Sequence, residues 1–217
     1  MAQEVTSARE RSSRSTANVV RGDIKTVGGV TENGYSAALK RNILSYEHQQ
    51  RQDWNEAMAF YDADGNQLNR VQGKHDRVPI AKGDIPTNAN GKMRDDLVFT
   101  HNHPGALDKS GYMRIGYSFS EDDMLIAVKY KAKEIRAVTP TYTFSFRRPS
   151  DGRKTTQADV RRAYDKAIRQ VTAEGQDYSD RVGYSNTVNN RYEITFWHKV
   201  NKLVSKELGW GYSKKRG

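Results

Sequence analysis

The chain has 217 residues, no cysteine, a hydrophobic content of 35% and a mean hydropathy of −0.90. The lack of cysteine excludes disulfides, thiolate metal sites and cysteine nucleophiles, and is typical of a reducing compartment such as the cytoplasm. We expect no membrane contact, because no apolar run approaches the roughly 20 residues of a spanning helix and no export signal is visible, whereas the net charge of +10 favours polyanionic partners.

The first third of the chain changes character near residue 35. Residues 1–33 lack aromatic side chains and a sustained hydrophobic period, so we expect a flexible N-terminal arm over 1–33. Apolar residues at helical spacing then predict a helix over about 35–50. Glu56 leads an apolar strand, and Asp64-Gly65 predicts a hairpin turn before a return strand over 68–71.

The middle of the chain carries the residues that we expect to form a metal site. A strand over 95–101 ends at His101, and His103 follows. Side chains alternate along a strand, which places both imidazoles on one side. Ser120 opens a helix over about 121–133, with Asp123 on its first turn. Two neutral nitrogens and one carboxylate are a typical zinc ligand set. Ser120 and Asp123 also have the spacing of an N-terminal capping box.

The remaining pattern predicts two strands, over 135–138 and 142–146, and then a boundary rich in helix breakers over 147–155. Two amphipathic helices follow, over 156–174 before Gly175 and over 192–208 before Gly209. We therefore predict an α+β fold in which helices flank a mixed β-sheet. Its metal-binding domain covers 34–150, and a basic helical C-terminal extension covers 151–217.

The C-terminal extension holds 14 basic and eight acidic residues. Its last residues interleave aromatic side chains with cations, a composition that would let bases stack while phosphates are neutralised. A solubilising tail is the other interpretation of this segment. The candidate polyanion-binding residues are Trp210, Tyr212, Lys214, Lys215 and Arg216.

The ordered set Glu56, His101-x-His103 and Ser120-x-x-Asp123 resembles the JAB/MPN (JAMM) metalloprotease family, its RadC-like branch in particular. A similar residue pattern occurs in domains attached to phage head proteins and bacterial toxins. The resemblance covers about residues 36–147 and implies layers like those of cytidine deaminases. It also implies a zinc ion held by His101, His103 and Asp123, with Glu56 as general base and Ser120 stabilising the tetrahedral intermediate.

Three rivals to these assignments remain open at the level of sequence. The spacer between His103 and Ser120 is long, so Ser118 competes with Ser120 and Asp122 with Asp123. Glu47 competes with Glu56, although it falls on the first expected helix.

The resemblance implies a zinc-dependent hydrolase that cleaves a peptide or isopeptide bond in a protein or peptide substrate. The alternative is a non-enzymatic or vestigial module of a phage, toxin or nucleic-acid-associated protein. Such a module would bind polyanions or a virion protein through its basic termini, and it would be virion-associated or delivered as an effector. A His-Asn-His nuclease fits less well, because that motif spreads its residues along a hairpin and a helix.

Overall fold

The structure is a computed structural model that describes residues 35–75, 77–104, 118–182 and 186–217. It does not describe the side chains of residues 178–194. The expected arm over 1–33 and most of the spacer between His103 and Ser120 lie outside the described residues. The elements are α2 (Ala37–Gln50), β1 (Ala57–Tyr61), β2 (Gln67–Gln72), the 3-10 turn η2 (Lys82–Asp84), β3 (Val98–Asn102), α3 (Glu121–Lys129), β4 (Glu134–Val138), β5 (Tyr142–Arg147), α4 (Gln157–Val182), α5 (Asn186–Leu208) and β6 (Gly211–Arg216).

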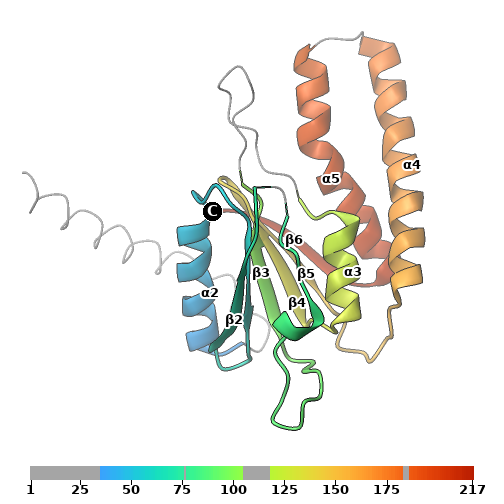
Figure 1. Ribbon diagram of the computed structural model, residues 1–217. Helices are drawn as coiled ribbons and strands as arrows, with labels where there is room; N and C mark the ends of the chain where they lie inside the picture. Colours follow the sequence, from blue (N-terminus) through green and yellow to red (C-terminus); the bar gives the residue numbers. More distant parts are fainter. Residues whose placement is uncertain (1–34, 76, 105–117, 183–185) are drawn as a thin grey trace, which may run out of the picture.

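The strands form one six-stranded mixed sheet in the order β2-β1-β3-β4-β5-β6. All neighbours are antiparallel except β3 and β4, which are parallel because α3 carries the chain back across the sheet between them. Helix α2 covers one face of the sheet, while α3 covers the other, with α4 and α5 beyond it (Figure 1). This arrangement confirms the predicted α+β fold with a mixed sheet flanked by helices.

The two C-terminal helices are longer than expected. Helix α4 continues through Gly175 to Val182 instead of ending there, and Gly175 is buried. Glycine weakens a helix only modestly, and packing along α5 outweighs that preference. The end of α5 matches the expectation, because Gly209 adopts the left-handed conformation (φ 71°) that follows many helix C-termini.

The last residues of the chain form a strand rather than a tail. Strand β6 pairs with β5 along its whole length and becomes one edge of the sheet. The expectation of a purely helical extension is therefore wrong for 211–216. The pattern was misleading because alternating charged and aromatic residues suit an edge strand as well as a tail.

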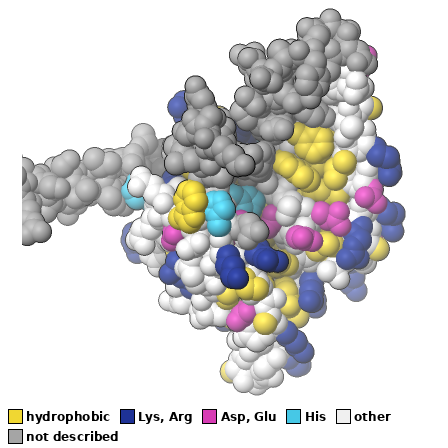
Figure 2. Space-filling model, turned by 45° about the horizontal axis from the view of Figure 1, so that its top comes forward, with side chains coloured by type: hydrophobic (Ala, Val, Ile, Leu, Met, Phe, Trp, Pro, Cys, Tyr) yellow, Lys and Arg dark blue, Asp and Glu magenta, His cyan; other side chains and the backbone are white. Residues whose placement is uncertain are grey.

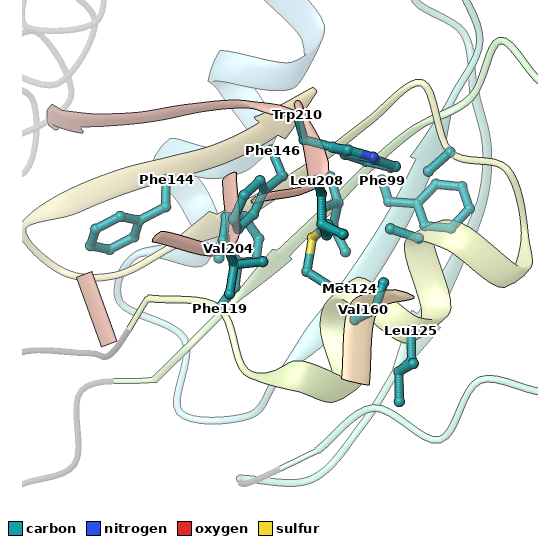
Figure 3. Packing of buried hydrophobic residues seen from close by; sticks show 14 of the residues in the cluster. Phe99, Phe119, Met124, Leu125, Phe144, Phe146, Val160, Val204, Leu208 and Trp210 are labelled. Atoms are coloured by element: carbon teal, nitrogen blue, oxygen red, sulfur yellow. The ribbon is translucent and has the colours of Figure 1, made fainter. Parts of the chain in front are cut away.

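Hydrophobic residues are buried on both faces of the sheet. A small cluster lies under α2, and a larger one lies on the opposite face, where residues of α3, α4 and α5 join those of the strands. Trp210 belongs to the larger cluster and is 3% exposed. Figure 3 shows it in one cluster with Phe99, Phe146 and Leu208. The C-terminal segment therefore shares its core with the sheet that carries the histidines.

A buried ionic network joins α2 to the sheet. Arg136 of β4 lies between Glu47 of α2 and Glu134, with N–O distances of 2.5 and 2.8 Å. Glu134 also pairs with Arg147 at 2.6 Å and accepts a hydrogen bond from the Tyr35 hydroxyl at 2.9 Å. Burial alone would raise the pKa of Glu134, but Arg136 and Arg147 hold that pKa below its ordinary value. The carboxylate is thus ionised inside the fold.

Among the described residues, no helix is both long and apolar enough to cross a bilayer.

The depressed pKa of Glu134 predicts how stability varies with pH. Glu134→Gln should lower the free energy of unfolding at neutral pH by about 3 kcal/mol, because it removes the negative charge that faces the buried guanidinium of Arg136 and the half-buried one of Arg147. A carboxyl group whose pKa is lowered by folding stabilises the protein at pH values above its unfolded-state pKa, which is 4.5 for Glu134. This stabilisation is lost as the pH falls through the lower folded-state pKa. The difference in the free energy of unfolding between Glu134→Gln and the parent, measured by urea titration, should therefore become smaller at acid pH.

Glu207→Gln is the matched control, because Glu207 forms an exposed ion pair with Lys166. It should change stability by less than about 1 kcal/mol. An equally small effect of Glu134→Gln would contradict a stabilising role for the network.

Candidate metal centre

The two histidines lie at the end of β3, in the middle of the sheet. His101 stands opposite Met58 of β1 and beside Ala137 of β4, so both neighbouring strands fix its backbone. The backbone N–H of His103 donates to the Val138 carbonyl at 2.7 Å and continues the pairing one step further. The two-residue period turns both rings toward the face covered by α3, and their Nε2 atoms are 2.9 Å apart.

Asp123 meets these nitrogens from the first turn of α3. Its Oδ1 is 3.1 Å from Nε2 of His101, and its Oδ2 is 3.8 Å from Nε2 of His103. Oδ2 also accepts hydrogen bonds from the backbone N–H and hydroxyl of Ser120, at 2.7 and 2.8 Å. Ser120 and Asp123 therefore form the capping box, and the same carboxylate faces the histidines.

The separations among the three side chains fit a single ion. One ligand atom from each of His101, His103 and Asp123 lies within 4.8 Å of the others. Two ligands bonded at about 2.0–2.1 Å to a tetrahedral ion are about 3.3 Å apart. The separations of 2.9 Å between the two Nε2 atoms and 3.1 Å between Nε2 of His101 and Oδ1 of Asp123 lie close to that value. The group could hold a metal ion, with a fourth position left for water.

The electrostatics of Asp123 suit a ligand. Burial alone would raise its pKa, but His101, His103 and the backbone N–H of Ser120 hold the pKa well below its ordinary value. The carboxylate is therefore anionic at neutral pH. The outer nitrogen of His101, Nδ1, is buried and has no hydrogen-bond partner in the described part of the chain. Packing against Phe119, at 6.1 Å between ring centroids, holds this ring instead.

The asparagine between the histidines braces the neighbouring strand. The side-chain oxygen of Asn102 accepts from the N–H of Ala57 at 2.8 Å, and its amide donates to the Asn55 carbonyl at 3.0 Å. These bonds hold the residues on either side of Glu56. Sequence reasoning noted this asparagine as part of a motif but did not predict its bracing role, which depends on the pairing of β1 with β3.

Glu56 lies just before β1, at the same end of the sheet. Two residues further along the chain, Met58 pairs with His101, the first of the two histidines. Its backbone is fixed by a bond from its N–H to the Lys74 carbonyl and by one from the Gly73 N–H to its own carbonyl, both 2.8 Å. The expected general base therefore starts the strand that pairs with β3 and is not one of the three clustered residues, and its catalytic role stays a prediction.

The structure also shows where the three competing residues of the sequence analysis lie. Glu47 is buried on the opposite face of the sheet in the ionic network with Arg136. Asp122 is exposed and lies outside the cluster. Ser118 is buried, with its hydroxyl 2.8 Å from that of Tyr212. Ser120 is thus the cap of α3, and its role in stabilising a tetrahedral intermediate stays a prediction.

Asn201 of α5 supports the segment that leads into α3. It is fully buried, and its amide donates to the carbonyl of Phe119 at 2.8 Å and to the hydroxyl of Ser118 at 3.2 Å. Its oxygen accepts from the hydroxyl of Tyr164 at 2.6 Å. The residue next to Ser120 is thereby tied to both C-terminal helices. Sequence reasoning missed Asn201, because a lone asparagine in an amphipathic helix carries no local signal.

The residues expected to bind polyanions are largely engaged within the fold. Trp210 is buried and donates from Nε1 to the Thr155 hydroxyl at 2.9 Å, so it cannot stack on a base, and that expectation is corrected. Tyr212 is half-buried, with its hydroxyl 3.0 Å from Nδ1 of His198. The ammonium of Lys214 lies 4.0 Å from the centroid of the Tyr142 ring. Lys215 and Arg216 are exposed on β6.

Comparison of the chain with protein-family models, with curated proteins and with solved structures finds no match. The resemblance to JAB/MPN metalloproteases therefore rests on the ordered residues alone and stays a prediction.

The geometry of the cluster predicts about one tightly bound metal ion per chain. His101→Ala should abolish binding, and so should Asp123→Asn, which keeps an oxygen that can cap α3. His48→Ala removes an exposed histidine of α2 and should bind metal as the parent does. Metal content after gel filtration, measured by mass spectrometry, checks this. Equal metal in all four proteins would place any bound ion elsewhere.

The contacts of Asn201 predict an indirect effect on the same site. Asn201→Ala frees the segment before Ser120 and should weaken metal affinity by roughly 10- to 100-fold, the range seen when supporting residues of metal ligands are removed. Lys202→Ala, an exposed neighbour on α5, should leave the affinity unchanged. Competition with a chromophoric chelator measures both. An unchanged affinity in Asn201→Ala would show that α3 holds Asp123 without help from α5.

Proposed function

We propose that the protein is a zinc-dependent hydrolase that cleaves a peptide or isopeptide bond. The observation that carries the proposal is the convergence of His101, His103 and Asp123, beside a strand that Glu56 directly precedes. Two imidazole nitrogens and one carboxylate suit zinc better than magnesium or calcium, which prefer oxygen ligands. Three protein ligands with one open position are typical of a catalytic rather than a structural zinc site.

The chain supplies the groups that such a hydrolysis needs besides the metal. A zinc ion bound by the three ligands would lower the pKa of its water to about 7 and polarise a substrate carbonyl. The carboxylate of Glu56 accepts a proton from the attacking water and delivers it to the departing amine nitrogen. The water oxygen thus ends in the new carboxyl group and the amine leaves neutral. Asp123 would hold the ion as a carboxylate and takes no part in the proton transfer.

Polyanion binding through the C-terminus has less support. Trp210 lies in the core, and the aromatic part of the expected stacking surface is therefore missing. What remains is a charge effect of exposed cations such as Lys215 and Arg216. The metal centre, by contrast, brings together residues that are far apart in the chain. We therefore propose hydrolysis rather than a binding module.

The proposed role of Glu56 predicts a separation of metal binding from turnover. Glu56→Gln should keep zinc but lower the cleavage rate by about 100-fold or more, because general base catalysis contributes that much. Glu121→Gln is the control, since Glu121 also lies near the site, on the first turn of α3, but outside the cluster. A mixture of peptides and isopeptide-linked peptides incubated with zinc-loaded protein, followed by mass spectrometry, reports cleavage.

Cleavage that survives both a chelator and Glu56→Gln would refute the proposal. Zinc-loaded wild-type protein that cleaves no amide bond in the mixture would also count against it.

A further inference from the structure

Trp54 is the most exposed large hydrophobic side chain of the described residues, at 55%. It stacks on His75, with ring centroids 4.5 Å apart and planes 20° apart. Nδ1 of His75 lies 2.9 Å from the Trp54 carbonyl, so the stack and a polar contact hold the pair together. On the face shown in Figure 2, an exposed hydrophobic side chain lies beside histidines. We call Trp54 and His75 the aromatic platform.

Backbone hydrogen bonds join the residues around the platform to one another. His75 lies in a tight turn that the bond from the Lys74 N–H to the Arg77 carbonyl closes at 2.9 Å. Gly73 permits this turn, since a Cβ there would lie only 2.2 Å from the Arg77 carbonyl oxygen. Residues 73 and 74 in turn bond to the backbone of Glu56. The platform and the proposed general base are therefore parts of one hydrogen-bonded unit.

A hydrogen bond also connects this unit to the segment that carries the two histidines. The Asn55 carbonyl, next to Trp54, accepts from Asn102, which lies between His101 and His103. The Cα of Trp54 is at most about 7.6 Å from that of Glu56, because consecutive Cα atoms are 3.8 Å apart. Met58, two residues after Glu56, pairs with the metal ligand His101, and the Cα atoms of such opposite residues are about 4.5–5.5 Å apart. The platform is thus two residues from the proposed general base and is joined by hydrogen bonds to the segment that carries the metal ligands.

We propose that the platform binds one flat or apolar side chain of the peptide substrate beside the bond that is cut. This inference rests on the proposed hydrolase function and adds a specificity-determining site to it. His75 covers one face of the indole, and more than half of Trp54 stays open to a single partner group. Its fixed position lowers the entropy lost on binding.

A peptide fits this position better than a nucleic acid. The proposed general base Glu56 is two residues from Trp54, and its carboxylate disfavours a phosphate group at this position. Lys74 and Arg77 are exposed on the same turn. They would suit an acidic residue next to the apolar one, without the regular charge spacing of a phosphate backbone. An oligonucleotide is therefore an outcome for the test to exclude.

The test uses the zinc-loaded full chain carrying Glu56→Gln, which should bind substrates without cutting them. Immobilised random octapeptides serve as the probe. The retained peptides should share Trp, Tyr, Phe, Leu or Pro at one position. Adding Trp54→Ala should weaken their binding about tenfold, the effect of losing an aromatic contact and its buried area. Trp54→Phe should keep most of the affinity.

Leu68→Ala, added to the same background, is the control, because Leu68 is another exposed large hydrophobic residue, at 38%, on β2. It should not change binding. Equal binding by the Trp54→Ala protein, retention of no peptide, or Trp54-dependent binding of single-stranded oligonucleotides in place of peptides would each overturn the inference.

Failure of the platform and failure of the hydrolase give different results. Peptides that bind through Trp54 but are not cut by the wild-type enzyme would refute hydrolysis and leave the platform. Cleavage with a KM that Trp54→Ala does not change would refute the platform and leave the hydrolase.

Discussion

The carboxylate of Asp123 connects the fold to the candidate site. One oxygen closes the capping box with Ser120 and so sets where α3 begins, while the other faces His101. A helix cap is worth about 1 kcal/mol and is held at short distance. The same bonds that start the helix therefore orient the ligand. Capping and metal binding are compatible here because a carboxylate has two oxygens and enough lone pairs for both.

The period of β3 divides the sheet into two different environments. Alternate residues point toward α2, where Thr100 donates to Glu47 at 3.2 Å within the ionic network, or toward α3, where the histidines lie. A one-residue shift in register would exchange these sets and bury the rings beside Arg136. Pairing on both sides, with β1 and β4, prevents that shift. The ionic network and the candidate metal centre thus depend on the same register.

The C-terminal third of the chain contacts the segment that leads into α3 and so supports the candidate site. Asn201 holds the segment before α3, and β6 brings Tyr212 against Ser118. Neither contact was predicted, since each joins residues about 80 to 94 positions apart and leaves no periodic trace. Aromatic and basic residues at the end of a chain look alike in a tail and in an edge strand. The last residues form an edge strand here because β5 offers backbone groups that they can pair with.

Local patterns determined the elements of this protein and the composition of its candidate ligand set. The apolar run before His101, the turn at Asp64-Gly65 and the cap at Ser120 act over a few residues, so they can be recognised in the sequence alone. The tertiary structure decided which residues meet. It separated Glu47 and Asp122 from the histidines, paired β1, which follows Glu56, with β3, buried Trp210 and left Trp54 exposed. These outcomes depend on strand order and helix packing, which arise from contacts between distant segments and the burial that they allow.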